Sequence, residues 1–177
     1  YMAAETSSYE EDKELWRKLY KMFIFDNEEL DALLEEQSLY WNDDKSLVDT
    51  FVIKTIKRFE EENGASQQLL PEYKDVADME FARKLFRTAI TNAEEYRALM
   101  SGSSKNWDMQ RLAFMDVVIM QTALAEILTF EDIPLSVTLN EYVEIAKYYS
   151  TAKSGSFVNG LLDSITKKLR QEGKINK

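Results

Sequence analysis

The sequence predicts an all-helical protein built from two packed helical subdomains. Over most of the 177 residues, apolar side chains recur at the three- and four-residue spacing of amphipathic helices. Only five glycines and two prolines occur, and no strand-like alternation flanks an Asn-Gly or Asp-Gly turn. With 45% hydrophobic residues, the chain is able to bury a substantial core. The polar stretch at residues 63–78 separates an acidic N-terminal helical lobe with its linker (1–77) from a C-terminal helical lobe (78–177).

The N-terminal lobe is predicted to hold three helices. The first runs from about Ser8 to Phe25, because Ser8 and Glu11 form a capping box ahead of an apolar stripe. A shorter helix follows at about 28–37, and residues 42–44 (Asn-Asp-Asp) are predicted to form a turn. The amphipathic run after this turn has its apolar side chains on one face, namely Leu47, Val48, Phe51, Val52, Ile56 and Phe59.

The C-terminal lobe is predicted to surround one apolar helix. A long helix begins near Asp78 and extends to about Tyr96, and residues 101–106 break the chain. The next segment, WDMQRLAFMDVVIMQTALAEIL, is apolar nearly all round, which is typical of a central helix. Its charged residues Asp116 and Glu126 must reach the surface or pair with partners, and both alternatives stay open. Two more helices follow Pro134, the last at about 155–171.

The composition argues against an enzyme. The chain has no cysteine and no histidine, so it lacks thiolate nucleophiles, disulfides and the most common general base. No phosphate-binding, metalloprotease, hydrolase or dinucleotide-binding motif occurs. The longest uncharged apolar-rich stretch is far shorter than the ~20 residues that cross a bilayer, and the N-terminus has no secretory signal pattern. These observations favour a binding module.

The net charge of −10 is distributed unevenly. Residues 1–104 carry 13 basic and 23 acidic side chains, whereas residues 105–177 carry nine of each. Because phosphate binding depends on lysine and arginine, the acidic part argues against nucleic acid, but the neutral part can present a local basic surface. Five basic residues near the end either form such a surface or complement the dipole of the last helix. They are Lys167, Lys168, Arg170, Lys174 and Lys177.

The stretch STAKSGSFVNG, residues 150–160, combines features of an RNA site at the start of the last helix. Ser154 or Ser156 can cap this helix, and Lys153 beside the first-turn N–H groups makes an anion site. Phe157 lies at the edge of the apolar stripe, where its ring can stack on an unpaired base. The alternative is an ordinary helix start with Phe157 in the core.

Three segments of the C-terminal lobe resemble the NusB family of bacterial transcription antitermination factors. They are WDMQRLAFMDVVIMQTALAEIL, DIPLSVTLNEYVEIAK and KSGSFVNGLLDSI, which follow in family order without an obvious gap. The resemblance covers about Asp78 to Leu169 and rests on several matched positions together. Residues 1–77 match weakly.

The resemblance implies a non-catalytic, cytoplasmic, all-helical protein that needs no cofactor and no metal. Such a protein binds boxA-type single-stranded RNA together with NusE, a small-subunit ribosomal protein, and works with the transcription elongation complex on ribosomal RNA. Carried over position by position, Lys153, Ser154 and Phe157 match the RNA-contacting segment, and Asp116 matches an acidic position that meets NusE. A homodimer that hides the RNA face also fits the family.

The chain departs from the family pattern at two places. Family members usually begin with an arginine-rich helix, whereas this chain begins with an acidic segment. They can also carry a basic residue where Gln121 stands here. Both differences remove phosphate contacts, so we expect weak RNA binding by the chain alone. The missing helix and the tyrosine start indicate the C-terminal portion of a longer relative.

Two other functions remain open from the sequence. One is a NusB-like accessory domain of an RNA cytosine methyltransferase, which would need a nucleotide-binding domain and a catalytic cysteine that this chain lacks. The other is a helical protein-interaction module that binds a basic partner through its acidic N-terminal lobe and does not bind RNA.

Overall fold

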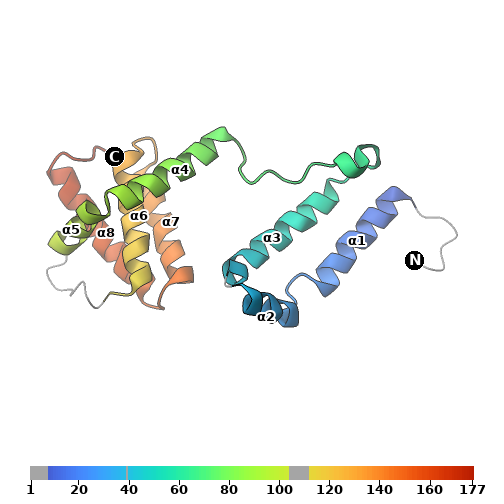
Figure 1. The fold of residues 1–177 in the computed structure, drawn as a ribbon. Coiled ribbons are helices and arrows are strands. Elements are labelled where there is room, and N and C mark those ends of the chain that lie inside the picture. The colour runs from blue at the N-terminus through green and yellow to red at the C-terminus, as the bar shows by residue number, and fades with distance from the viewer. Residues whose placement is uncertain (1–7, 39, 104–111) are drawn as a thin grey trace. The chain divides into compact units, whose positions relative to one another are not determined.

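The computed structural model describes residues 8–38, 40–103 and 112–177, and every regular element among them is a helix (Figure 1). This confirms the all-helical class. The chain divides into two compact units, Tyr1–Glu72 (unit 1) and Tyr73–Lys177 (unit 2). Unit 1 holds α1 (Tyr9–Phe23), α2 (Glu28–Gln37), α3 (Tyr40–Lys57) and the 3-10 helix η1 (Glu61–Ser66). Unit 2 holds α4 (Val76–Thr91), α5 (Ala93–Ser103), α6 (Phe114–Thr129), α7 (Leu135–Tyr149) and α8 (Ser154–Gln171).

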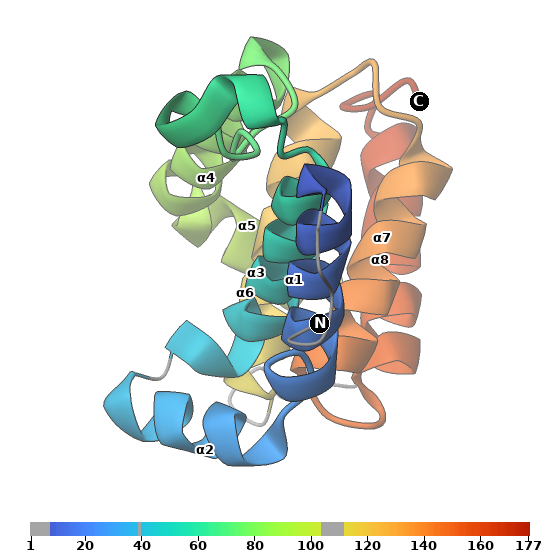
Figure 2. The ribbon, with the colours of Figure 1, turned by 90° about the vertical axis from the view of Figure 1, so that its right-hand side faces the viewer.

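In unit 1, both α1 and α2 pack against α3, and the two views show α1 and α3 side by side (Figure 1, Figure 2). The predicted capping box begins α1, because Ser8 Oγ accepts from the N–H of Glu11 while Glu11 Oε2 accepts from the N–H of Ser8. Asn27 caps α2 with a single hydrogen bond, because its Oδ1 accepts from the N–H of Leu30 at 3.0 Å. The predicted turn at 42–44 is wrong, since α3 begins at Tyr40 and continues through these residues.

Unit 2 is organised around α6, which packs against α4, α5, α7 and α8. This confirms its prediction as the central helix, and half of its sixteen residues are buried. All the buried apolar side chains of the described residues lie in unit 2, between Ala89 and Ile175. Gln121 donates from Nε2 to the Ala89 carbonyl at 2.8 Å and so ties α6 to α4.

Two helices of unit 2 differ from the prediction. The helix expected over about 78–96 ends at Thr91, and α5 begins at Ala93 after a break at Asn92. The segment predicted to be helical from Trp107 is seen as α6 only from Phe114, and residues 104–111 lie outside the described residues. Among the described helices, none is long and apolar enough to cross a membrane.

Candidate nucleic-acid interface

The α7–α8 hairpin carries the predicted RNA segment. Residues 150–153 are the whole connection between α7 and α8, which pack against each other (Figure 2). α7 ends where Ser150 turns to an extended conformation, with its N–H still bonded to the Ala146 carbonyl at 3.2 Å. Lys153 directly precedes α8 and Phe157 lies in its first turn, so the hairpin holds both beside the same loop.

Ser154 is buried, with 1% of its surface exposed, and its hydroxyl makes hydrogen bonds within the loop. Its Oγ accepts from the N–H of Thr151 at 3.0 Å and lies 2.8 Å from Thr151 Oγ1. Lys153 occupies the N-cap position of α8, and no side chain makes a capping hydrogen bond there. The predicted cap by Ser154 or Ser156 is therefore wrong, because the buried hydroxyl turns back toward the loop instead.

Lys153 and Phe157 differ in exposure. The Lys153 side chain is exposed, whereas Phe157 is half-buried and packs against the hydrophobic core of unit 2. The ring is thus held in place by the core while part of it remains accessible. A held aromatic ring next to an exposed cation is an arrangement suited to stacking a base and attracting its phosphate.

Asp116, in the first turn of α6, lies beneath the loop. It is 5% exposed, and its Oδ1 accepts a hydrogen bond from Ser150 Oγ at 2.6 Å. The sequence allows this charge to be either exposed or paired, and the structure buries it against the Ser150 hydroxyl. Its carboxylate therefore does not share the accessible surface of Lys153 and Phe157. The residues exposed beside it are Phe114 and Met115.

Several residues at this end of unit 2 were missed from the sequence. Tyr148 and Tyr149 close α7 and are 83% and 50% exposed. The stem of Lys147 crosses the start of α8, where a Cβ added to Gly155 would lie 2.8 Å from Lys147 Cγ. A tyrosine pair directly before a Ser-Thr loop was the available signal, but the contact between Lys147 and Gly155 depends on the hairpin geometry.

Two of the five basic residues at the end of α8 pair with nearby carboxylates. Lys167 Nζ lies 2.7 Å from Asp163 Oδ2, and Lys174 Nζ lies 2.9 Å from Glu172 Oε2. Lys177 Nζ donates to the Phe130 carbonyl, and burial lowers the pKa of this ammonium against the pull of nearby carboxylates. These contacts favour the interpretation of this cluster as a solvated helix end.

The second buried carboxylate of α6, Glu126, has a structural partner. Tyr142 on α7 donates its hydroxyl to Glu126 Oε2 at 3.0 Å. Burial, together with the adjacent carboxylate, raises the pKa of the Tyr142 hydroxyl. Within the described part of the chain, no group of three histidine, cysteine, aspartate or glutamate side chains is placed to hold a metal ion.

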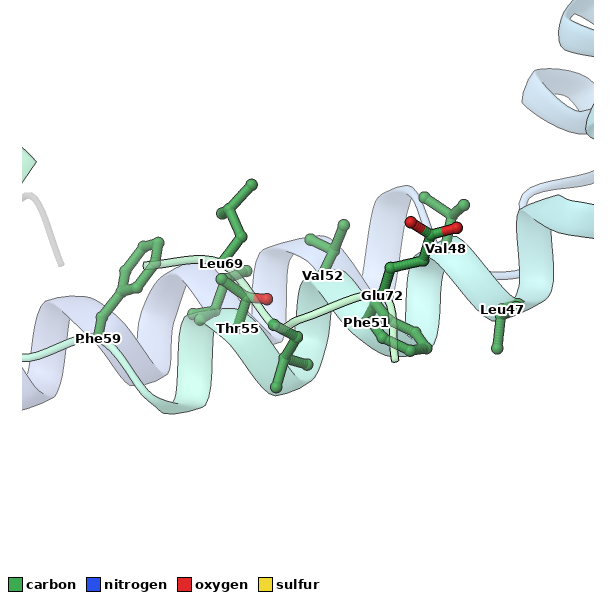
Figure 3. A pocket seen from close by; sticks show the side chains of 10 residues that line it. Leu47, Val48, Phe51, Val52, Thr55, Phe59, Leu69 and Glu72 are labelled. Carbon is green, nitrogen blue, oxygen red and sulfur yellow. The ribbon is translucent and has the colours of Figure 1, made fainter. Parts of the chain in front are cut away.

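Unit 1 offers a different kind of surface. A groove of about 520 Å³ lies between α3 and residues 69–72, and apolar side chains line it except for Thr55 and Glu72 (Figure 3). Leu47 and Leu69 at this groove are 57% and 75% exposed. Its apolar lining and accessibility are typical of surfaces that bind another protein segment.

Comparisons with known proteins agree with this architecture. The NusB family model matches residues 50–167. Transcription antitermination protein NusB of Salinibacter ruber is 36% identical over 132 residues, which are 71% of this chain and 82% of that protein. NusB of Chloroherpeton thalassium is 34% identical over 122 residues, 68% of this chain and 58% of that protein. NusB of Geobacter sulfurreducens is 39% identical over 97 residues, 55% of this chain and 70% of that protein.

A solved structure points to the same family. That of T. maritima NusB is similar with a TM-score of 0.51 at 37% identity, covering 63% of this chain and 78% of that chain. The family match covers more than half of the sequence and includes α6, α7 and most of α8. From the sequence match and the shared fold together, the chain belongs to the NusB family, whose named members here are transcription antitermination proteins, a non-catalytic role.

Proposed function

We propose that the chain supports transcription antitermination by binding boxA-type single-stranded RNA together with the ribosomal protein NusE. The observation that carries the RNA part is the junction of the α7–α8 loop with α8. There, the N–H of Phe157 donates to the carbonyl of exposed Lys153 at 3.2 Å, and the half-buried Phe157 side chain packs against the core of unit 2. A phosphate meets the cation and the start of α8, and an unpaired base stacks on the accessible part of the ring.

RNA affinity is expected to depend on the partner. The chain carries a net charge of −10, and two of the five basic side chains at the end of α8, Lys167 and Lys174, pair with nearby carboxylates. Few phosphates can therefore be neutralised by the chain alone, so release of counterions contributes little to its binding. A basic partner that joins the RNA-bound complex would supply the missing charge.

In this proposal NusE binds at the first turn of α6. Phe114 is 76% exposed and Met115 is 38% exposed, directly beside buried Asp116. Exposed aromatic and methionine side chains are enriched at protein interfaces. In this proposal the apolar side chains touch NusE, and Asp116 supports the surface from below.

The test is fluorescence anisotropy of a labelled boxA-type RNA titrated with the chain, with and without NusE, at two salt concentrations. We expect salt-sensitive binding in the presence of NusE, which Lys153→Glu and Phe157→Ala each weaken roughly tenfold, the order of one charge or stacking contact. Lys167→Glu is the matched control, because this lysine lies on the same helix away from the loop and pairs with Asp163. Equal effects of Lys153→Glu and Lys167→Glu would contradict a site at the loop.

A second candidate function is protein binding by unit 1 without RNA. The apolar groove on α3 favours it, and residues 1–72 of the sequence carry 18 acidic and 8 basic side chains. The matching partner is a basic protein segment with an apolar face. Its opposite charge would raise the rate of association. Calorimetric titration with NusE tests this: binding should fall when Glu10, Glu11, Glu28 and Glu29 become glutamine and should survive Asp116→Arg. The reverse pattern would contradict it.

A further inference from the structure

We propose that Asp116 is a positioning residue, which holds the loop carrying Lys153 in its RNA-binding shape through the hydroxyls of Ser150 and Ser154. This inference rests on the proposed RNA function of the loop and names how that loop is controlled. It differs from a direct partner contact by Asp116, because the carboxylate lies beneath the loop with 5% of the residue exposed.

A continuous chain of hydrogen bonds joins Asp116 to the loop. Ser150 Oγ donates to Asp116 Oδ1 at 2.6 Å, and Ser154 Oγ donates to Ser150 Oγ at 3.1 Å. Thr151 Oγ1 lies 2.8 Å from Ser154 Oγ, and the Thr151 N–H donates to the same Ser154 oxygen at 3.0 Å. These hydrogen bonds thus link the first turn of α6, the end of α7 and the first residue of α8.

The carboxylate of Asp116 determines which group donates in each of these hydrogen bonds. An ionised carboxylate only accepts hydrogen bonds, and each hydroxyl has a single proton to donate. Ser150 therefore directs its proton to Asp116, Ser154 directs its proton to Ser150, and Thr151 directs its proton to Ser154. A change at Asp116 consequently removes the acceptor that orients all three hydroxyls.

The hydrogen bond from Ser150 to Asp116 is stronger than a hydrogen bond between two hydroxyls. Hydrogen bonds to a charged group are roughly twice as strong as neutral ones, and a buried carboxylate that loses its donor keeps its full desolvation cost. The 2.6 Å separation lies in the short range of charge-assisted O–H to carboxylate contacts. The Ser150 contact is therefore the strong end of the chain.

The Ser154 N–H donates to the Thr151 carbonyl at 2.9 Å within the loop, and the Ser150 contact with Asp116 ties the loop to α6. The loop is four residues long, and no side chain caps the start of α8 that follows it. Ser150 and Ser154 flank Lys153 on either side, so their positions set where its backbone leaves α7 and enters α8. Rotation of Ser150 away from Asp116 would release both ends of the segment.

The experiment compares the full chain with Ser150→Ala, Asp116→Ala, which removes the acceptor, the double variant and Ser150→Thr, which keeps a hydroxyl. Ser156→Ala is the matched control, since this serine is exposed at the same helix start and outside the hydrogen-bond chain. Amide hydrogen exchange at Thr151 reports the loop directly, and anisotropy of labelled boxA-type RNA with NusE reports its function. Circular dichroism melting confirms that each variant is folded.

We expect Ser150→Ala to raise Thr151 exchange and to weaken RNA binding roughly three- to tenfold, the size of one such hydrogen bond. The double variant should be no worse than the stronger single variant, because both changes break the same contact. Ser150→Thr should restore exchange and affinity.

Unchanged exchange in Ser150→Ala, or raised exchange with unchanged RNA affinity, would overturn the positioning role. Additive losses in the double variant would overturn it as well, since they would mean that the two residues act separately. If the unaltered chain with NusE binds no RNA, the proposed function itself fails. In that case the Thr151 exchange rates still decide whether Asp116 holds the loop.

Discussion

The ammonium of Lys45 lies 2.6 Å from Oδ2 of Asp49 inside unit 1, one helical turn along α3. The same Nζ lies 2.7 Å from Asp31 on α2 and donates to the Ile24 carbonyl, at the end of α1, at 3.2 Å. One cation therefore joins all three helices. Burial works to lower the pKa of Lys45, but its hydrogen bonds to Asp31 and Asp49 outweigh burial and raise it.

Removal of this cation should unfold unit 1. Lys45→Met leaves the Asp49 carboxylate buried without its cation, which costs about 3–5 kcal/mol in comparable buried pairs. Lys21→Met is the matched control, because Lys21 is an exposed lysine near the end of α1. Thermal melting followed by circular dichroism should show loss of part of the helical signal only in Lys45→Met. Equal melting of the two variants would contradict the role of Lys45.

High pH should weaken unit 1 through Tyr20. Burial raises the pKa of this hydroxyl to about 12, aided by its hydrogen bond to Asp49 Oδ1 at 2.6 Å. An unfolded tyrosine ionises near pH ~10, so between ~10 and ~12 the folded chain holds a proton that the unfolded chain has lost. The stabilisation is complete below about pH 10 and is lost as pH rises through about 12.

The alkaline measurement is urea unfolding at about pH 9 and about pH 11, on either side of the tyrosine transition. The fall in unfolding free energy between them should be smaller in Tyr20→Phe than in the parent chain. Tyr40→Phe removes a hydroxyl from an 83% exposed residue of α3, so the free energy of unfolding should fall as much as in the parent chain. If the free energy of unfolding of Tyr20→Phe falls as much as that of the parent chain, a group other than Tyr20 causes the alkaline sensitivity.

Two glycines of α8 should respond oppositely to alanine. Gly155→Ala places a Cβ 2.8 Å from Lys147 Cγ, and this overpacking should cost about 1–3 kcal/mol. Gly160→Ala meets nothing within 4 Å and should stabilise the helix by roughly 0.5–1 kcal/mol through its better helix propensity. Urea unfolding measures both, and Lys147→Ala should rescue Gly155→Ala. Equal signs for the two glycines would contradict the close approach.

The groove of unit 1 should bind hydrophobic probes. Leu69→Ser removes an apolar side chain that is 75% exposed at the groove, so binding of the dye ANS should fall while stability changes by about 0.5 kcal/mol or less. Leu33→Ser removes a 57% exposed leucine of α2 outside the groove and should leave dye binding unchanged. Equal dye binding by the two variants would show that the groove is not the binding surface.

Local sequence patterns predicted most of the helices. The capping box at Ser8 and the apolar stripe of α8 are complete within one helix, so α1 and α8 were placed to within two residues. The break at Asn92 was missed although Asn92 followed by Glu94 and Glu95 is a helix-start pattern. The apolar spacing continues across this break and so masked it.

Local sequence patterns could not predict the hydrogen-bond partners of the buried polar groups. Asp116 meets Ser150 across 34 positions of sequence, and Gln121 meets the Ala89 carbonyl across 32. Whether a charge in an apolar helix is exposed or satisfied depends on which loop folds over it, and that depends on helix packing. Lys153 and Phe157 could be proposed because their signal lies within one short segment, whereas the burial of Ser154 depended on the loop around it.

The hydroxyl chain at the α7–α8 loop also limits how this surface can discriminate ligands. Phosphate oxygens accept hydrogen bonds but cannot donate them. The protons of Thr151, Ser154 and Ser150 are already directed inward to Asp116, so these three hydroxyls cannot donate to an arriving phosphodiester without breaking that order. If the proposed RNA site is correct, selection among RNA sequences would therefore depend on the fit of a base against the Phe157 ring, while Lys153 would attract the phosphate of any sequence equally.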